Sequence, residues 1–247
     1  MNRLQTELCR LYLSPDPQPE GQAPAGAGPG LVNASGQVRA MVMDVTQPVG
    51  WDGVAALWQG VQDDLDLPAP AIAVSGIDGY QVWFSMAQPI PVAQAHDFLE
   101  LLRQRYLGAI APRHIGMSPA ADASAPGLAR HARLVPALQV DSGHWSAFVA
   151  PGLAGMFATE PWLDLAPSPD AQANILSGFE SIQSADFQRA QDRLQPASAP
   201  PVRDTASSPL PSPNDSAPKR FLLSVMNDPA TELRLRIEAA KALLPYV

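Results

Sequence analysis

Apolar residues recur with helical and strand periods through the first two thirds of the chain. A spacing of three and four residues predicts amphipathic helices, and a spacing of two predicts half-buried strands. The helical pattern covers residues 2–13, 52–65 and 91–106, and the strand pattern covers Gln37–Val45 and both arms of a hairpin between Ala71 and Met86. Strands interleaved with amphipathic helices predict an α+β fold, in which helices cover a mixed sheet.

Local capping residues suggest where the helices begin. We expect Asp52 to be the N-cap of the second helix and Pro91 to open the third. Ser168-Pro169-Asp170 is typical of a helix start, and Ser184 is the expected cap of a further helix. Weaker strand patterns lie at Ile110–Met117 and Trp145–Val149.

The hairpin between Ala71 and Met86 is the densest local signal. Asp78-Gly79 is a strong hairpin dipeptide, because Gly tolerates a positive φ and Asp can bond its own backbone. The flanking β-branched and aromatic residues are those that half-buried strands favour. The hairpin could be a structural centre or the wall of a binding site.

The positions of proline and glycine indicate where the core of the chain is interrupted and where it ends. Its 27 Pro and 17 Gly exceed what a compact domain uses. They gather in a predicted loop at 14–36 and in a segment at 196–218 that has too few large apolar residues to form a core. We therefore predict a core at 1–195, a disordered linker at 196–218 and a helical interaction tail at 219–247.

The net charge of the chain argues against one class of function, which is broad binding of duplex DNA. The net charge is −8, whereas a protein that covers duplex DNA by neutralising phosphates is basic. Any nucleic-acid contact must therefore be local or depend on a metal or a partner. Cys9 is the only cysteine, so no intrachain disulfide can form. No signal sequence or membrane span is apparent, which leads us to expect a cytoplasmic protein without membrane contact.

Two pieces of the predicted core together resemble a known family. Met43-Asp44-Val45-Thr46 ends a strand, and Ser75-Gly76 with Gly79-Tyr80-Gln81-Val82-Trp83-Phe84 follows one helix later. Their order and spacing are similar to those of archaeo-eukaryotic-type primases and primase-polymerases. In that family an acid–x–acid motif binds divalent metal, and a hairpin with a histidine contacts the phosphates of the incoming nucleotide.

The resemblance implies a set of site residues. Asp44 and the downstream Asp141 would be the catalytic acids and the ligands of Mg or Mn. Nucleotide or DNA would contact Ser75, Gly76, Gly79, Gln81, Trp83 and Arg133. Thr46 stands where the family has a second acid, and Gln81 stands where it has the histidine. Losing a metal carboxylate weakens ion binding, so the resemblance implies a catalytically degraded core.

The tail carries a second, shorter resemblance. Phe221–Pro229 followed by Leu235–Tyr246 is similar to a helical segment of phage terminase small-subunit-like proteins. This implies a prophage or mobile-element protein whose tail binds a protein partner through Arg234, Arg236 and Lys241. The alternative is a plain amphipathic helix that serves self-association.

Three alternatives stay open from sequence. The hairpin and Asp44 could serve the fold alone. The protein could be a non-enzymatic phage packaging or assembly factor that acts through its tail. It could also be an acidic protein that occupies a basic surface on another protein.

Overall fold

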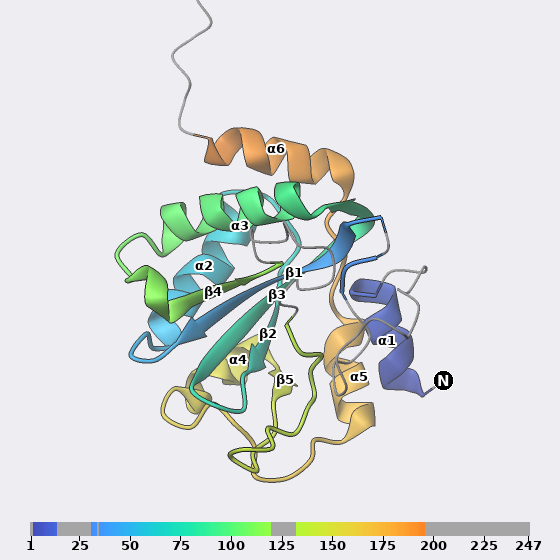
Figure 1. Ribbon diagram of the computed structural model, residues 1–247, viewed down its shortest axis with the longest axis vertical. Coiled ribbons are helices and arrows are strands. Elements are labelled where there is room, and N and C mark those ends of the chain that lie inside the picture. Colours follow the sequence, from blue (N-terminus) through green and yellow to red (C-terminus); the bar gives the residue numbers. More distant parts are fainter. Residues whose placement is uncertain (1, 14–30, 34, 120–131, 196–247) are drawn as a thin grey trace, which may run out of the picture. The chain divides into compact units, whose positions relative to one another are not determined.

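A five-stranded antiparallel sheet with helices on both faces forms the core of the protein (Figure 1). The computed structural model describes residues 2–13, 31–33, 35–119 and 132–195. The strands are β1 (Gln37–Thr46), β2 (Ala71–Val74), β3 (Gly79–Pro91), β4 (Ile115–Ser118) and β5 (Ala147–Val149). The helices are α1 (Arg3–Leu11), α2 (Trp51–Asp63), α3 (Val92–Tyr106), α4 (Pro151–Ala154), α5 (Pro169–Ser177) and α6 (Ser184–Leu194), with 3-10 turns η1 (Pro112–His114) and η2 (Gly155–Phe157). The predicted α+β class is confirmed, but the sheet is antiparallel where a mixed one was predicted, because β3 lies between β1 and β2 and pairs antiparallel with each of them.

The sheet order is β4-β1-β3-β2-β5. From β1 to β4 the chain runs strand, helix, strand, strand, helix, strand, which is the split βαβ arrangement. In it the two central strands, β1 and β3, are far apart in sequence but pair along most of their length. Strand β5 extends this unit by pairing with the outer edge of β2.

Alternation along the strands gives the sheet two buried faces. On one face Met41, Met43 and Val45 of β1 pack with the apolar stripes of α2, α3 and α6. On the other face Val42 of β1 and Trp83 of β3 pack with α1 and α5. Both faces are therefore covered by helices, whereas the sequence pattern indicated cover on at least one face.

Two predicted helix caps are wrong, and two helix starts are confirmed. The N-caps of α2 and α6 are Gly50 and Gln183, so Asp52 and Ser184 lie inside the first turn. A carboxylate is also favourable there, beside the positive end of the helix dipole, which explains why Asp52 resembled a cap. Helix α3 begins directly after Pro91, and α5 begins with Ser168 as N-cap and Pro169 in its first turn.

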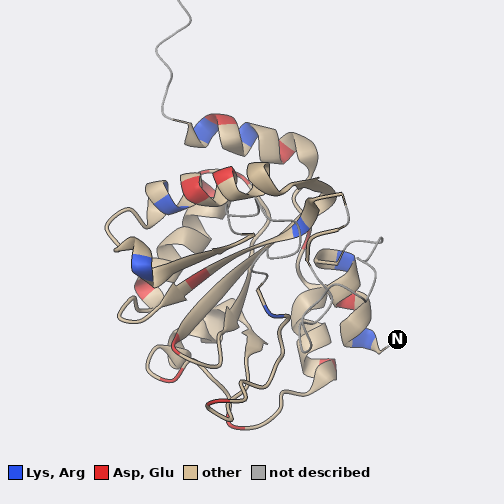
Figure 2. Ribbon diagram, viewed as in Figure 1, with Lys and Arg blue, Asp and Glu red and all other residues tan. Residues whose placement is uncertain are grey.

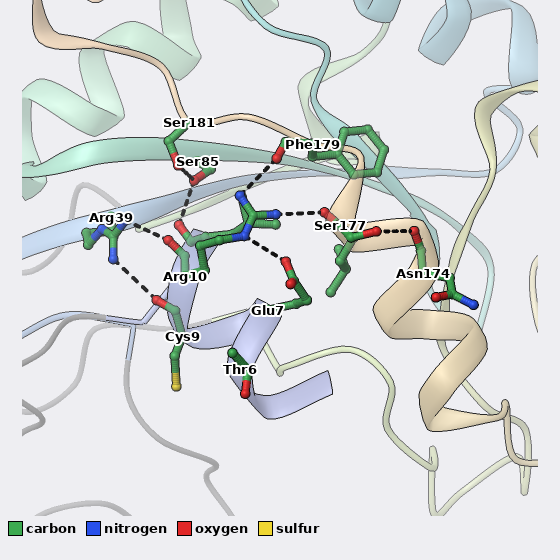
Figure 3. Close-up of polar contacts among 12 residues, drawn as sticks. Thr6, Glu7, Cys9, Arg10, Arg39, Ser85, Asn174, Ser177, Phe179 and Ser181 are labelled. Carbon is green, nitrogen blue, oxygen red and sulfur yellow. Dashed lines mark hydrogen bonds and ion pairs between the residues drawn. The ribbon is translucent and has the colours of Figure 1, made fainter. Parts of the chain in front are cut away.

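Arg39 of β1 connects the end of helix α1 to the sheet by hydrogen bonds (Figure 3). Its guanidinium donates to the carbonyl oxygens of Arg10 at 2.7 Å and Cys9 at 3.3 Å, and also to those of Leu13 and Met86. Burial lowers the pKa of Arg39. A guanidinium suits this position because its planar array of N–H groups can reach several carbonyls at once.

Arg10 makes the matching connection to helix α5 (Figure 3). Its two terminal nitrogens donate at 3.0 Å to the carbonyls of Leu176 and Phe179, at the end of α5. Glu7 accepts from the same guanidinium at 2.7 Å. Ser85 of β3 donates to the carbonyl of Leu11 at 2.6 Å. These bonds satisfy carbonyls that a helix end leaves without partners, and they join α1, α5 and the sheet.

Among the described residues, no helix is long and apolar enough to cross a membrane. The linker predicted at 196–218, the tail predicted at 219–247 and most of the loop predicted at 14–36 lie outside the described residues.

We predict that Arg39→Met lowers the free energy of unfolding by about 2 kcal/mol or more, because hydrogen bonds to a charged group contribute about 1.5–3 kcal/mol and the carbonyls would lose their donor. Urea unfolding followed by circular dichroism measures it. Arg105→Met is the control, since Arg105 is exposed on α3 and an exposed change of this kind stays within about 0.5 kcal/mol. Equal losses in the two variants would contradict the role of Arg39.

Candidate functional site

Asp44 and Gln81 face each other on two interior strands of the sheet, near the end of β1. They are paired residues of β1 and β3, and Gln81 Nε2 donates to Asp44 Oδ1 at 2.7 Å. Trp83 Nε1 donates at 3.2 Å to Gln81 Oε1. Because the indole can only donate, it fixes the amide of Gln81 with its NH₂ group toward the carboxylate. The resemblance-derived residues Asp44, Gln81 and Trp83 thus form one hydrogen-bonded row.

The carboxylate of Asp44 is electrostatically unfavourable in this position. Burial raises its pKa most, the Gln81 hydrogen bond opposes that rise, and the charge of Asp78 adds to it. Among the described residues, Asp44 has no salt bridge to a Lys or Arg. The site therefore contains negative charge that its described neighbours do not neutralise.

Asp78 is the acidic neighbour that the sequence analysis did not assign to the site. It lies at the exposed tip of the β2–β3 hairpin, where its carbonyl accepts from the backbone N–H of Gln47. Its place just before Gly79 led us to treat it as a turn residue. In the structure Gly79 pairs with Thr46, two residues beyond Asp44, which brings the hairpin tip to the end of β1. The sequence alone gives no signal for this register.

Gly116 of β4 leaves space beside Asp44, on the side of β1 opposite to β3. It is the β4 residue paired with Asp44. A Cβ at position 116 would lie 3.2 Å from Asp44 Cβ and 3.4 Å from its Oδ2. That separation is tight, so Gly116 keeps the second carboxylate oxygen of Asp44 free of a crowding side chain. A single Gly in a short strand gives little signal in sequence.

The hairpin turn differs from the predicted one. Residues 75–78 form the loop, and the positive φ of 79° belongs to Gly76, not to Gly79. The hydroxyl oxygen of Ser75 accepts from the backbone N–H groups of Ile77, Asp78 and Gly79 at 3.0–3.1 Å. The predicted Asp78-Gly79 turn is therefore wrong, because the Ser75 side chain organises a longer loop.

Gly79 is required for close packing of the backbone. A Cβ there would collide with the carbonyl oxygen of Val45 and lie 2.8 Å from Thr46 Cα. Gly76 is similarly constrained, since a Cβ would lie 2.8 Å from the backbone nitrogen of Ser146. Ser75, Gly76 and Gly79 thus each have a structural reason to be present, alongside the nucleotide contact that the resemblance implies.

Arg133 lies close to the same hairpin. Its Nη1 donates to Gln139 Oε1 at 3.5 Å, and Gln139 Nε2 donates to the carbonyl of Ser75 at 3.2 Å. Two residues further on, Val135 is buried in the same cluster as Trp83. The segment that carries Arg133 therefore runs over the face of the sheet that Asp44 and Gln81 share.

Asp141 is placed differently from Asp44. It lies in an exposed turn, in which Gly143 N–H donates to the carbonyl of Gln139, and its neighbour Ser142 donates to the carbonyl of Gly76. The structure brings this turn to the hairpin tip but records no interaction between Asp141 and Asp44. Within the described parts of the chain, no three His, Cys, Asp or Glu side chains are grouped as metal ligands.

Thr46 uses its hydroxyl within the sheet, since Oγ1 donates to the carbonyl of His114 at 3.4 Å. The predicted partner-binding residues Arg234, Arg236 and Lys241 lie outside the described residues. No family model matches the chain, and no curated protein matches it.

Gly79→Ala should lower the free energy of unfolding by about 1–3 kcal/mol, because the added methyl group must displace the backbone of β1. Thermal unfolding followed by circular dichroism measures the change. The control is Gly152→Ala in α4, where a Cβ would contact nothing within 4 Å. If the two variants are equally stable, the close approach at Gly79 does not constrain the hairpin.

Asp44→Asn should raise the free energy of unfolding at neutral pH. Asn keeps an acceptor for Gln81 but has no charge to bury. The folded-state pKa of Asp44 is raised above the usual value of about 3.9. The parent protein therefore loses stability as the pH rises from the pKa of Asp44 in the unfolded chain to its higher pKa in the folded protein.

Urea unfolding from about pH 3.5 to about pH 8 tests this expectation. The advantage of the Asn variant should be small at the acid end, grow between these two pKa values and then level off. Asp192→Asn, an exposed carboxylate on α6, is the control and should show no such growth. A parent protein that stays the more stable one at neutral pH would contradict the unfavourable burial of Asp44.

Proposed function

We propose that the core is a catalytically degraded, primase-polymerase-like module that binds a nucleoside triphosphate or a nucleic-acid end, in a protein of prophage or mobile-element type. The observation that carries the proposal is the pairing of Asp44 with Gln81 on the central strands of a βαββαβ sheet. Asp44 matches the metal-binding acid of that family, and Gln81 stands where the family has its phosphate-contacting histidine.

A divalent cation fits the chemistry of this site. Asp44 is a partly buried carboxylate beside the charge of Asp78, and a cation would relieve the desolvation and the repulsion that raise its pKa. Magnesium is commonly held by one or two carboxylates together with substrate phosphates. Asp44 and Asp78 would hold the ion, which would neutralise phosphate charge when bound. Asp141 remains a proposed third acid from the resemblance.

The chain's own groups would orient the nucleotide. The Gln81 amide, held by Trp83, donates one N–H to Asp44 and would offer its second N–H to a ligand at the position where the family has a histidine. Arg133 supplies a positive charge next to the hairpin through its contact with Gln139. Because Gln81 is neutral and Thr46 replaces a carboxylate, we expect binding with weak or absent nucleotidyl transfer.

Isothermal titration calorimetry with dATP, with and without Mn²⁺, tests the proposal. We expect binding that requires Mn²⁺ and is weakened at least about tenfold by Asp44→Asn, because even outer-shell partners of a metal typically contribute about 10–100-fold to its affinity. Asp192→Asn, which changes the net charge equally at an exposed position on α6, should bind as the parent does.

If dATP does not bind in the presence of Mn²⁺, or if Asp44→Asn binds as tightly as the parent, the nucleotide site is refuted. The resemblance would then reflect the fold alone.

A further inference from the structure

Exposed large apolar side chains gather at one end of the described structure. They are Ile77, Leu138, Val140, Leu153, Met156 and Leu165, and they include every such side chain among the described residues. Val140 and Leu165 are 82% and 81% exposed. Four of them, Ile77, Leu138, Val140 and Leu165, lie in loops, and Leu153 and Met156 lie in α4 and η2, just before the last of these loops. Single exposed apolar residues are ordinary, but such a concentration is typical of an interaction site.

Hydrogen bonds join these loops into one surface. The hairpin tip is bonded to the segment after α4 through Gly76 N–H and the carbonyl of Pro161, at 3.0 Å. It is bonded to the segment before β5 through Gln139 and Ser142. Backbone bonds between Trp145 and Leu163 connect the two segments. We call residues 75–78, 137–146 and 158–165 the loop surface, which lies at the lower end of Figure 1.

The ring of His144 gives the loop surface further rigidity. It stacks on Trp162 with ring centroids 4.7 Å apart and an interplanar angle of 1°. Its Nε2 lies 3.8 Å from the carboxylate of Asp164. The surface is therefore built from interlocked segments, so a partner would not have to order it on binding.

The loop surface is acidic. It carries Asp78, Asp141, Glu160 and Asp164, all exposed, and its three segments contain no Lys or Arg. One exposed cation, Arg133, borders it through the contact with Gln139 and leaves the acids in excess. Figure 2 shows the same distribution along the lower loops. Apolar side chains among carboxylates complement a partner that presents apolar side chains among Lys and Arg.

We propose that the loop surface docks a basic amphipathic helix of a partner protein. Charge complementarity favours this occupant over the others. A second copy would place the same carboxylates against each other, and nucleic acid would place phosphates against them. The apolar residues would cover the apolar stripe of the helix, and the four acids would face its Lys and Arg residues.

The probe is a synthetic helical peptide of Leu and Lys, in which successive Leu residues are alternately three and four positions apart, so that they form one apolar face. Isothermal titration calorimetry with the full chain should show binding that weakens when salt is raised from about 50 mM to about 500 mM. Val140→Ser with Leu165→Ser should weaken binding at least about tenfold, since both side chains would be buried on docking. Asp141→Asn with Asp164→Asn should also weaken it and reduce its salt dependence.

Matched controls separate this surface from the overall negative charge. Asp170→Asn with Asp192→Asn makes the same charge change on exposed positions of α5 and α6 and should leave binding unchanged. Peptides with Glu in place of Lys, or Ser in place of Leu, should not bind. Circular dichroism checks that each variant is folded, as expected for changes at exposed side chains.

The proposal is overturned if the loop-surface variants and the control variant bind the peptide equally. It is also overturned if Val140→Ser with Leu165→Ser turns a dimer into a monomer by light scattering, because a second copy then covers the surface. Tighter binding of a DNA oligonucleotide than of the peptide at the same residues would overturn it too. The loop surface shares Asp78 and Asp141 with the proposed nucleotide site, so the peptide titrations are run without dATP or Mn²⁺. Val140→Ser with Leu165→Ser changes no residue of that site, so its effect separates failure of the docking surface from failure of the nucleotide site.

Discussion

The pairing of β1 with β3 is the constraint on which the rest of the structure depends. Both strands are central, and their register sets Asp44 against Gln81 and Thr46 against Gly79. A shift of one residue would turn every side chain of one strand to the opposite face and bury Asp44 among α2 and α3. The apolar residues of the two faces therefore hold the polar row in place. Gly79 contributes by allowing the strands to approach at the hairpin end.

The site combines a fixed hydrogen-bond geometry with uncompensated charge. Trp83 orients Gln81, and Gln81 orients Asp44, so hydrogen bonds between side chains fix this row. The amide lowers the pKa of Asp44, yet burial and Asp78 act in the opposite direction. A carboxylate in that condition contributes little to folding, which is why its presence among so many apolar side chains favours a binding role.

Local patterns predicted much of this fold. The helical stripes of α2 and α3 and the arms of the hairpin are encoded within short windows, so periodicity alone located them. The caps at Gly50 and Gln183 were missed because Asp52 and Ser184 also suit the first turn of a helix. The turn was misassigned because the Ser75 hydroxyl, which holds three backbone N–H groups, competes with the Asp78-Gly79 preference.

Features that depend on contacts between distant parts of the chain were harder to predict from the sequence. The residues Asp44, Gln81 and Trp83 could be singled out by resemblance, but their hydrogen bonds depend on strand register, which no local window contains. The nearness of Asp78 and the space at Gly116 follow from β3 and β4 flanking β1. The α1 attachment through Arg39 joins segments separated in sequence, and a lone Arg in a strand gives no sign of it.

Trp83 contacts both the polar row of β1 and β3 and the residue that follows helix α1. Its indole is 1% exposed, bonds to Gln81 on one side and lies 5.1 Å from the ring of Tyr12, just after α1, on another. Its light emission should therefore be shifted to short wavelength, and it should respond both to a ligand that moves Gln81 and to release of the first helix. Since the chain has five tryptophans, a variant that keeps only Trp83 would carry an internal optical reporter that links the central row to the attachment of the N-terminal segment.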